Sequence, residues 1–324
     1  MRYLAGRLAQ TAFLLIGVSF LTFLFSSLAP GNYFDEMRLN PQISAETLGS
    51  LRAKYQLDQP LPVRYARWVI SLARGEMGYS FAYNSPVATL LWVRTRNTLL
   101  LTLTATLIAW MVALPLGVWS AETLGRLPDR LLSLASATLL AIPDLVLALT
   151  LLILATRSGW LPTGGLVSVD FDGLTWYGKI RDLARHMALP VSALVLGALP
   201  ILVRHIRAAV AEVLDAPFLR AASAHGIARR KLLYGYALRA AANPLISLFG
   251  FSIGTLLSGS LLVEVVMSWP GLGPLLLEAI LARDLYVVIG GVLFSTVFLV
   301  VGNFLADVML YWADPRIRTE ASAD

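Results

Sequence analysis

The chain has 324 residues, of which 57% are hydrophobic and 14% are charged. Average soluble domains are about 45–50% apolar and about 25% charged, so this composition excludes a soluble globular, disordered or collagen-like chain. The absence of cysteine excludes disulfides, cysteine zinc sites, iron–sulfur clusters and thiol catalysis, and the net charge of +6 is not gathered in a soluble patch suited to nucleic acid. We therefore expect an all-α polytopic membrane protein.

Six uncharged runs are long enough to cross the ~30 Å hydrocarbon core as helices of about 20 residues. In chain order they are 8–28, 98–121, 131–155, 189–203, 245–263 and 286–312. The first run, in the amino-terminal region 1–30, exceeds the apolar region of about 7–15 residues in a signal peptide and is interpreted as a retained membrane helix. The fourth run is short and contains two prolines, so we expect it to gain apolar turns on its cytoplasmic side.

Basic residues in the short loops predict the orientation, because loops on the cytoplasmic side carry an excess of lysine and arginine. With the amino terminus inside, thirteen basic residues fall in cytoplasmic segments and five in short outer loops, when the long segment after the first run is left out. Both termini, including the tail 314–324, are therefore expected in the cytoplasm.

The long segment 31–97 is expected on the outer side as a small helical cap. Helical stretches are expected over 44–55 and 63–73, and apolar residues of the second stretch share one face by i, i+4, i+7 spacing. A solvated insertion without a role is the alternative interpretation. The remaining residues, 98–313, would form the membrane core.

Charged residues inside the apolar runs are few, and each costs about 2.5–3.5 kcal/mol at a helix centre on insertion scales. Asp144 follows Pro143 in the middle of the third run, where the proline frees a carbonyl and can open the helix towards a cavity. One hypothesis is that both residues line a polar path and that Asp144 meets a cationic group. The alternative is a hydrogen bond from Asp144 to a neighbouring helix. Asp307, in the last run, is interpreted as a packing or capping acid.

The sequence contains no complete motif for catalysis or metal binding. Residues 173–179 have the glycine and lysine spacing of a phosphate-binding loop, but Ile180 stands where a serine or threonine must bind magnesium. The three histidines lack metal-ligand spacing, and neither a G-x-S-x-G nor an H-E-x-x-H motif is present. We therefore expect this chain to have no catalytic residue, no metal site and no bound cofactor.

The cytoplasmic loop 204–244 is expected to carry a short projecting helix. Pro217 disfavours helix at the residue before it, so the fourth membrane helix should end there. A segment of small residues follows and closes at Gly226, where glycine permits a left-handed backbone. Three cations then begin the next helix, where they oppose the helix dipole, and a partner with acidic residues would explain them.

This stretch resembles the EAA-type coupling motif of ABC-importer permeases, in which such a helix sits in a groove of the ATP-hydrolysing subunit. The residues that the resemblance assigns to contact with the ATPase are Phe218, Leu219, Arg220, Ala221, Ala222, Ala224, His225, Gly226, Arg229, Arg230 and Lys231. The chain departs from the motif at three positions. Pro217 replaces an acidic residue, His225 replaces a lysine, and Ala228 replaces a serine whose loss as a helix cap costs about 1 kcal/mol.

A wider resemblance, to the dipeptide/oligopeptide importer permeases, extends over nearly the whole chain. The stretches that carry it are Leu57-Asp58-Gln59-Pro60-Leu61, Gly75-Glu76-Met77-Gly78-Tyr79-Ser80 and Pro86-Val87 in the outer segment, Glu264 with Trp269-Pro270-Gly271-Leu272-Gly273 in an outer loop between the fifth and sixth spans, and Asp314-Pro315-Arg316-Ile317-Arg318 at the carboxyl end. The long outer segment further resembles the first of the two permeases of such a transporter.

This resemblance implies a type I ABC-importer permease fold with six membrane helices in the bacterial inner membrane. It implies import of di- or oligopeptides by alternating access, driven by ATP and Mg²⁺ in two partner ATPase subunits. A second homologous permease and an external substrate-binding protein would complete the assembly. Nickel chelates, glutathione and sugars stay open as substrates, because related permeases resemble one another closely.

Two functions from other classes are kept. A proton-coupled secondary transporter acting alone would use Asp144 as its carrier, but it leaves the projecting cytoplasmic helix unexplained. A membrane scaffold without transport predicts no conformational change with substrate. A separate packing signal is the four-residue repeat of Gly250, Gly254 and Ser258, which predicts a close helix neighbour, either in this chain or in a second permease.

Overall fold

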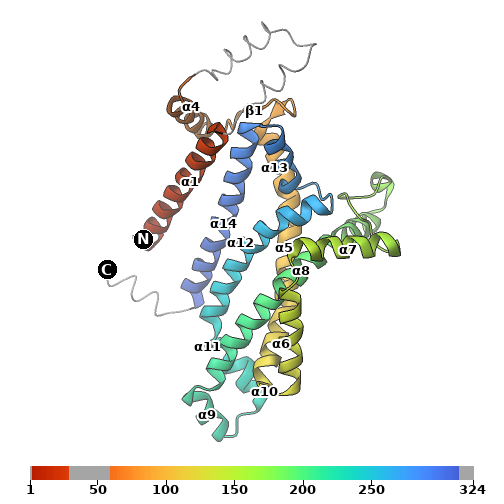
Figure 1. The fold of residues 1–324 in the computed structure, drawn as a ribbon. Helices are drawn as coiled ribbons and strands as arrows, with labels where there is room; N and C mark the ends of the chain where they lie inside the picture. Colours follow the sequence, from red (N-terminus) through yellow and green to blue (C-terminus); the bar gives the residue numbers. More distant parts are fainter. Residues whose placement is uncertain (1, 29–58, 314–324) are drawn as a thin grey trace. The chain divides into compact units, whose positions relative to one another are not determined.

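The computed structural model describes residues 2–28 and 59–313 (Figure 1). The helix expected over 44–55 and the tail 314–324 lie outside these residues. The chain divides into two compact units, the first formed by residues 1–98 and 270–298 and the second by residues 99–269 and 299–324. Helices α5 (Val87–Glu122) and α14 (Leu285–Ala313) each contribute residues to both units.

The first unit contains α1 (Arg2–Leu28), α4 (Leu61–Ala73), a two-stranded antiparallel sheet of β1 (Tyr79–Ser80) and β2 (Ser85–Pro86), and α13 (Leu272–Leu281). Helix α4 covers the stretch in which a helix was expected at 63–73. Its Trp68 is buried in a cluster with Phe23 and Ile289, which explains the apolar face of this helix. Helix α13 lies in what the sequence analysis treated as a loop.

The second unit is built around α8 (Trp176–Leu214), which packs against α6 (Leu127–Leu140), α7 (Asp144–Ser158) and α12 (Ala242–Val266). Its other elements are η1 (Phe171–Gly173), α9 (Pro217–Ala224), α10 (Arg229–Lys231), η2 (Leu232–Ala237) and α11 (Leu238–Ala240). Small residues let the helices approach closely. At Gly117 of α5, an added Cβ would lie 2.7 Å from the Ile206 side chain of α8.

Among the described residues, five helices are long and apolar enough to cross a membrane, and the bent pair α6 and α7 makes a sixth if it is counted as one span. The five are Gln10–Leu28, Val87–Glu122, Trp176–Leu214, Ala242–Val266 and Leu285–Trp312. The expected all-α fold is confirmed. The short fourth run gains turns after residue 203, as expected, and α8 also extends before residue 189, so that it spans Trp176–Leu214.

The third run is not a single helix over 131–155. Helix α6 ends at Leu140 and α7 begins at Asp144, and the two are bent by 94° (Figure 1). Pro143 has an extended backbone with ψ of 140° at this break. Proline disfavours helix at the residue before it and supplies no N–H to the preceding turn, so the chain turns sharply instead of kinking.

The glycine repeat in the fifth span packs against the same chain. An added Cβ at Gly250 would lie 2.2 Å from Ala306 of α14, and one at Gly254 would lie 2.1 Å from Leu299. The predicted close helix neighbour is therefore α14 of this chain, within the second unit.

Candidate functional site

The segment after α8 forms a short helix bounded by proline and glycine, as the sequence predicted. Helix α8 ends at Leu214, and α9 begins at Pro217 after an extended residue. Gly226 closes the segment with φ of +78° and with no atom within 4 Å of an added Cβ. Figure 1 shows α9 and α10 together at one end of α8. The glycine is therefore required by its left-handed backbone and not by crowding.

One face of α9 anchors it to the chain. Leu219 is 4% exposed and packs in a cluster with Leu232 and Ala237, and Ala222 lies against the same cluster. The remaining residues that the sequence analysis assigned to this contact surface are exposed: Phe218, Arg220, Ala221, Ala224, His225, Gly226, Arg229, Arg230 and Lys231. We call this exposed set the coupling surface. Leu219 and Ala222 hold α9 in place beneath it.

The cations of the coupling surface fall into two groups. Arg229 donates from Nε to Oε1 of Glu122 on α5 at 2.6 Å and from Nη2 to the Glu122 carbonyl at 3.3 Å. Arg220 lies 3.9 Å from Asp215, with both side chains largely exposed. Arg230 and Lys231 are exposed and have no ion-pair partner among the described residues. These two cations are available to an acidic partner.

The backbone after these cations differs from the regular helix that the sequence analysis expected. Helix α10 has only three residues and is followed by a six-residue π-helix, η2, before α11 and α12. The chain is helical from Arg229 to Ala240 in these three consecutive segments, and Asn243 and Pro244 lie in the first turn of α12. π-Helical segments are rare and are frequently found at functional sites.

A polar groove of about 510 Å³ lies between the end of α5, the end of α8, α9 and α10. Its charged lining residues are Glu122, Asp215, Arg220 and Arg229. The Arg229–Glu122 pair crosses from the coupling surface to α5, so α9 and α10 are tied to a membrane helix by charge as well as by the Leu219 cluster.

A buried carboxylate beside the loop was missed by the sequence analysis. Asp129, in the first turn of α6, is 2% exposed and accepts hydrogen bonds from Arg207 Nε at 2.5 Å and Nη2 at 2.9 Å. It also accepts from Ser120 Oγ at 2.7 Å and from Gly125 N at 2.8 Å. This network joins α5, α6 and α8 through one side chain.

Asp144 is the first residue of α7 and lines a cavity of about 120 Å³ with residues of α8 and α12. The wall includes Gly197, Ile201, Thr255 and Gly259. An added Cβ at Gly197 would lie 3.0 Å from Asp144 Oδ1, so the glycine leaves room for the carboxylate. The alternative of a hydrogen bond to a neighbouring helix is not found, since Asp144 has no such partner among the described residues. Pro143 forms the break that places Asp144 there.

The residues assigned to an outer loop are buried, and Glu264 is not in a loop, because it lies in the last turn of α12. In the second unit, Glu264 and Trp269 are 0% and 1% exposed, and the Trp269 N–H donates to the Glu264 carbonyl at 2.9 Å. In the first unit, the Pro270 carbonyl accepts from Asn97 Nδ2 at 2.8 Å. Gly271 precedes α13 with an extended backbone, and Gly273 is buried within that helix.

A second polar cluster in the first unit was also missed. The buried Asp284 carboxylate accepts from Ser80 Oγ at 2.6 Å and from the Ala82 N–H at 3.3 Å. The Tyr83 hydroxyl donates to the Glu278 carboxylate, and burial together with this bond raises the pKa of Tyr83 above its ordinary value. These bonds fix the strand turn on α13 and on the residue that precedes α14.

Several helices of membrane-spanning length, with a short exposed helix between two of them, are typical of a multi-pass membrane component of a transport system. Residues 113–319 match the family described as binding-protein-dependent transport system inner membrane component, and the chain belongs to this family. It is therefore a multi-pass inner-membrane protein of the permease class, and the sequence-based prediction of the family is confirmed.

Curated relatives match nearly the whole chain. The oligopeptide transport system permease protein AppB of Bacillus subtilis is 33% identical over 98% of this chain and 99% of its own length. The di/tripeptide transport system permease protein DppB of Pseudomonas aeruginosa is 34% identical over 98% of both chains. The dipeptide transport system permease protein DppB of Escherichia coli is 32% identical over 98% of this chain and 99% of its own length.

A solved structure supports the fold. A chain of the MetNI methionine ABC transporter in an inward-facing conformation superimposes with a TM-score of 0.55 at 18% identity, covering 69% of this chain and 96% of that chain. The expected type I ABC-importer permease fold is therefore confirmed.

Proposed function

We propose that this chain is a transmembrane permease subunit of an ATP-driven importer that passes di- or oligopeptides across the inner membrane by alternating access. The observation that carries the proposal is the anchored helix α9 with its exposed, cationic coupling surface, in a chain that is similar along 98% of its length to peptide permeases. The chain itself forms the path and does not hydrolyse ATP.

The proposed assembly has three kinds of partner besides lipid. A second homologous permease pairs with this chain, two ATP-binding subunits use ATP and Mg²⁺, and an extracytoplasmic binding protein delivers the substrate. The family description supports the dependence on a binding protein. Exposed Arg230 and Lys231 support an acidic groove on the ATPase, which would place the coupling surface and both termini in the cytoplasm.

Coupling requires that the ATP-bound and ATP-free states of the partner contact the coupling surface differently, because a partner shifts a conformational equilibrium only by its differential affinity. Movement of α9 would reach α8 through the Leu219 cluster and α5 through the Arg229–Glu122 pair. The Asp129–Arg207 network would carry α6 with them.

The path role of Pro143 and Asp144 is part of the proposal. The break at Pro143 turns the start of α7 towards α8 and α12, and the Asp144 carboxylate enters a cavity between them. A charge held in a membrane helix at this cost is a functional pointer when it faces a cavity. A proton-coupled transporter that works without ATPases has nothing in its favour in the fold or among the relatives.

The test is transport by the complete complex in proteoliposomes. We expect a labelled tripeptide to accumulate only when loaded binding protein and ATP with Mg²⁺ are both supplied. The control is the same complex with an ATPase subunit inactivated for hydrolysis, which should not accumulate peptide. Accumulation driven by a proton gradient without ATP would overturn the proposal and favour the secondary transporter.

A further inference from the structure

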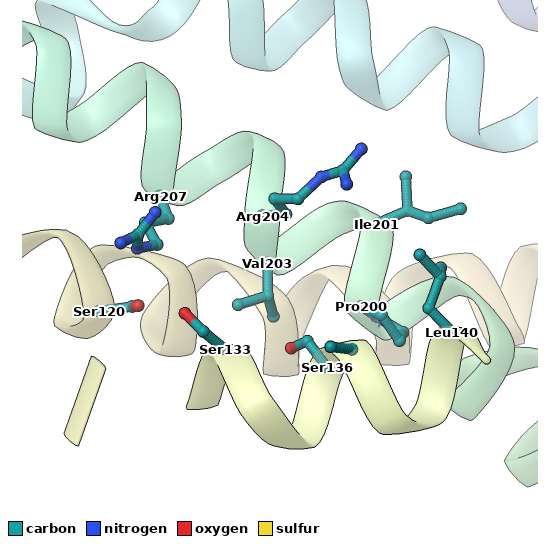
Figure 2. Close-up of a pocket in the computed structure, with 10 residues that line it drawn as sticks. Ser120, Ser133, Ser136, Leu140, Pro200, Ile201, Val203, Arg204 and Arg207 are labelled. Atoms are coloured by element: carbon teal, nitrogen blue, oxygen red, sulfur yellow. The ribbon is translucent and has the colours of Figure 1, made fainter. Parts of the chain in front are cut away.

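A second cavity lies next to the one at Asp144. It has a volume of about 180 Å³ and is walled by the end of α5, by α6 and by α8. Figure 2 shows its polar residues, which are Ser120, Ser133, Ser136, Arg204 and Arg207, among the apolar side chains of Leu140, Pro200, Ile201 and Val203. Ile201 lines this cavity and the Asp144 cavity alike, so the two are neighbours along α8.

The charges of this second cavity do not cancel. The Arg207 guanidinium is paired with Asp129 at 2.5 Å. Arg204 is exposed and has neither an ion pair nor a hydrogen bond among the described residues. One unpaired positive charge therefore lies at the edge of this cavity, on the exposed side of α8.

Two hydroxyl groups of α6 also line this cavity. Ser133 and Ser136 on α6 make no side-chain hydrogen bond among the described residues. Thr138 on the same helix bonds the Leu134 carbonyl at 3.0 Å, the usual arrangement for a hydroxyl inside a helix. In Figure 2, Ser133 and Ser136 lie on the side of α6 that faces α8. Both serines line the same cavity as Arg204, but in Figure 2 the Arg204 side chain extends on the side of α8 away from α6, so Arg204 is the group placed to pair with a carboxylate.

The two cavities carry opposite charges on one face of α8. Gly197, Ile201 and Arg204 follow one another at i, i+4 and i+7, which places them on the same face. The Asp144 carboxylate lies against Gly197, and Figure 2 shows the Arg204 side chain running along α8 towards Ile201. At about 1.5 Å per residue, Gly197 and Arg204 are about 10 Å apart along the helix axis.

We propose that this face of α8 is a transient site for the two termini of a short peptide, with the ammonium group at Asp144 and the carboxylate at Arg204. The proposal rests on the proposed import of peptides and names the groups that this chain recognises. A fully extended chain spans about 3.3–3.6 Å per residue, so a peptide of about three residues reaches from one charge to the other. The apolar residues between Asp144 and Arg204 would accommodate different peptide side chains without selecting among them.

The first experiment compares peptide analogues in the reconstituted complete complex. Trialanine, trialanine amide and N-acetyl-trialanine are supplied with saturating binding protein, and each variant is compared with wild type for the same peptide, so that the preference of the binding protein cancels.

Arg204→Gln should slow the import of trialanine about tenfold, the loss expected for one charge-assisted hydrogen bond, and should leave the import of trialanine amide unchanged. Asp144→Asn should slow the import of trialanine and leave that of N-acetyl-trialanine unchanged. Arg130→Gln, which removes an exposed cation of α6 that does not line the cavity, is the matched control and should change neither.

The second experiment reads occupancy without transport. The chain has no cysteine, so Ser133→Cys introduces its only thiol, whose alkylation in the intact complex is followed by the mass of this chain. Trialanine should slow the alkylation, and N-acetyl-trialanine amide should not. Thr138→Cys, on the same helix but outside the cavity, should be protected by neither peptide.

Equal protection of Ser133→Cys by both peptides, or protection by neither, overturns the site. An equal decrease in the import of all three peptides by Arg204→Gln overturns it as well. Failure of the proposed function gives a different result. In that case the wild-type complex itself accumulates no trialanine with ATP. A wild-type complex that imports trialanine while Arg204→Gln and Asp144→Asn import all analogues normally refutes only the terminus site.

Discussion

Asp129 and Arg207 lie 78 residues apart in the sequence, and their side chains form a two-point ion pair at 2.5 and 2.9 Å. Ser120 and the Gly125 N–H satisfy the rest of the carboxylate. Breaking a buried pair is far more costly than never having formed it, because the remaining charge keeps its desolvation cost without its partner. The network is therefore a point at which one substitution should disturb three helices together.

We expect Asp129→Asn to destabilise the complex by about 2 kcal/mol, since the buried carboxylate that accepts from Arg207, Ser120 and Gly125 is lost, while Arg207 is half-buried and keeps part of its hydration. Thermal unfolding of the purified complex in detergent measures the effect. Asp172→Asn, which changes an exposed acid in η1, is the control and should leave the midpoint in place. An Asp129→Asn complex as stable as the control would show that the pair contributes nothing to the fold.

A second pair, between Arg229 and Glu122, joins the coupling surface to α5. This pair is more exposed, so we expect it to contribute little to stability and to transmit movement of the coupling surface to α5. We expect Arg229→Glu to lower peptide transport several-fold while ATP hydrolysis continues. The charge-swapped double variant Glu122→Arg with Arg229→Glu should recover transport if the contact acts within this chain. Failure of the swap to recover any transport would assign Arg229 to contact with the partner instead.

At the scale of elements, the features that the sequence predicted are those with local signals. Apolar runs located the membrane helices, and Pro217 with Gly226 located α9, because each residue acts on its own backbone. The 94° break at Pro143 was only partly anticipated, since the proline marks the position but the angle depends on how α7 packs on α8 and α12.

Features that depend on distant residues were not predicted. Asp129 was not identified as a candidate, because nothing near it in the sequence indicates Arg207 as its partner. The inward role of Leu219 follows from its packing on Leu232 and Ala237, which requires the turn at Gly226 to be in place first. Helix α13 is short, and its Leu272 and Leu275 are buried by tertiary packing, so its apolar residues gave no span signal.

The left-handed turn at Gly226 sets the direction of the chain after α9. Gly226→Ala adds about 1 kcal/mol of backbone strain and should weaken transport mildly, because no neighbour touches the added Cβ. Gly226→Pro forbids the observed φ of +78° and should abolish transport while ATP hydrolysis no longer responds to the loaded binding protein. Transport and ATPase assays on one preparation measure both.

Gly165→Ala, at a φ of +84° in another loop, carries the same strain as Gly226→Ala and should leave coupling normal. Normal stimulation of hydrolysis in Gly226→Pro would contradict the role of the turn.

At the scale of the whole molecule, this chain presents chemically different surfaces to different partners. Its helices carry large exposed apolar residues such as Met111, Leu134 and Ile153, which suit lipid or a second permease. The coupling surface carries exposed cations, which suit an acidic protein groove. Loss of one kind of partner should therefore be separable from loss of the other.

We expect the double charge reversal Arg230→Glu with Lys231→Glu to remove the ATPase subunits from the complex and to retain the second permease. Both cations are exposed without an ion pair among the described residues, so their reversal leaves the fold of this chain intact and repels only an acidic partner. Affinity purification under mild detergent, followed by mass spectrometry of the subunits, measures the composition. Arg157→Glu reverses an exposed cation at the end of α7, away from the coupling surface, and should retain every subunit. ATPase subunits retained at the wild-type ratio would show that these cations do not bind them, whereas joint loss of the ATPases and the second permease would show that the variant damages the chain itself.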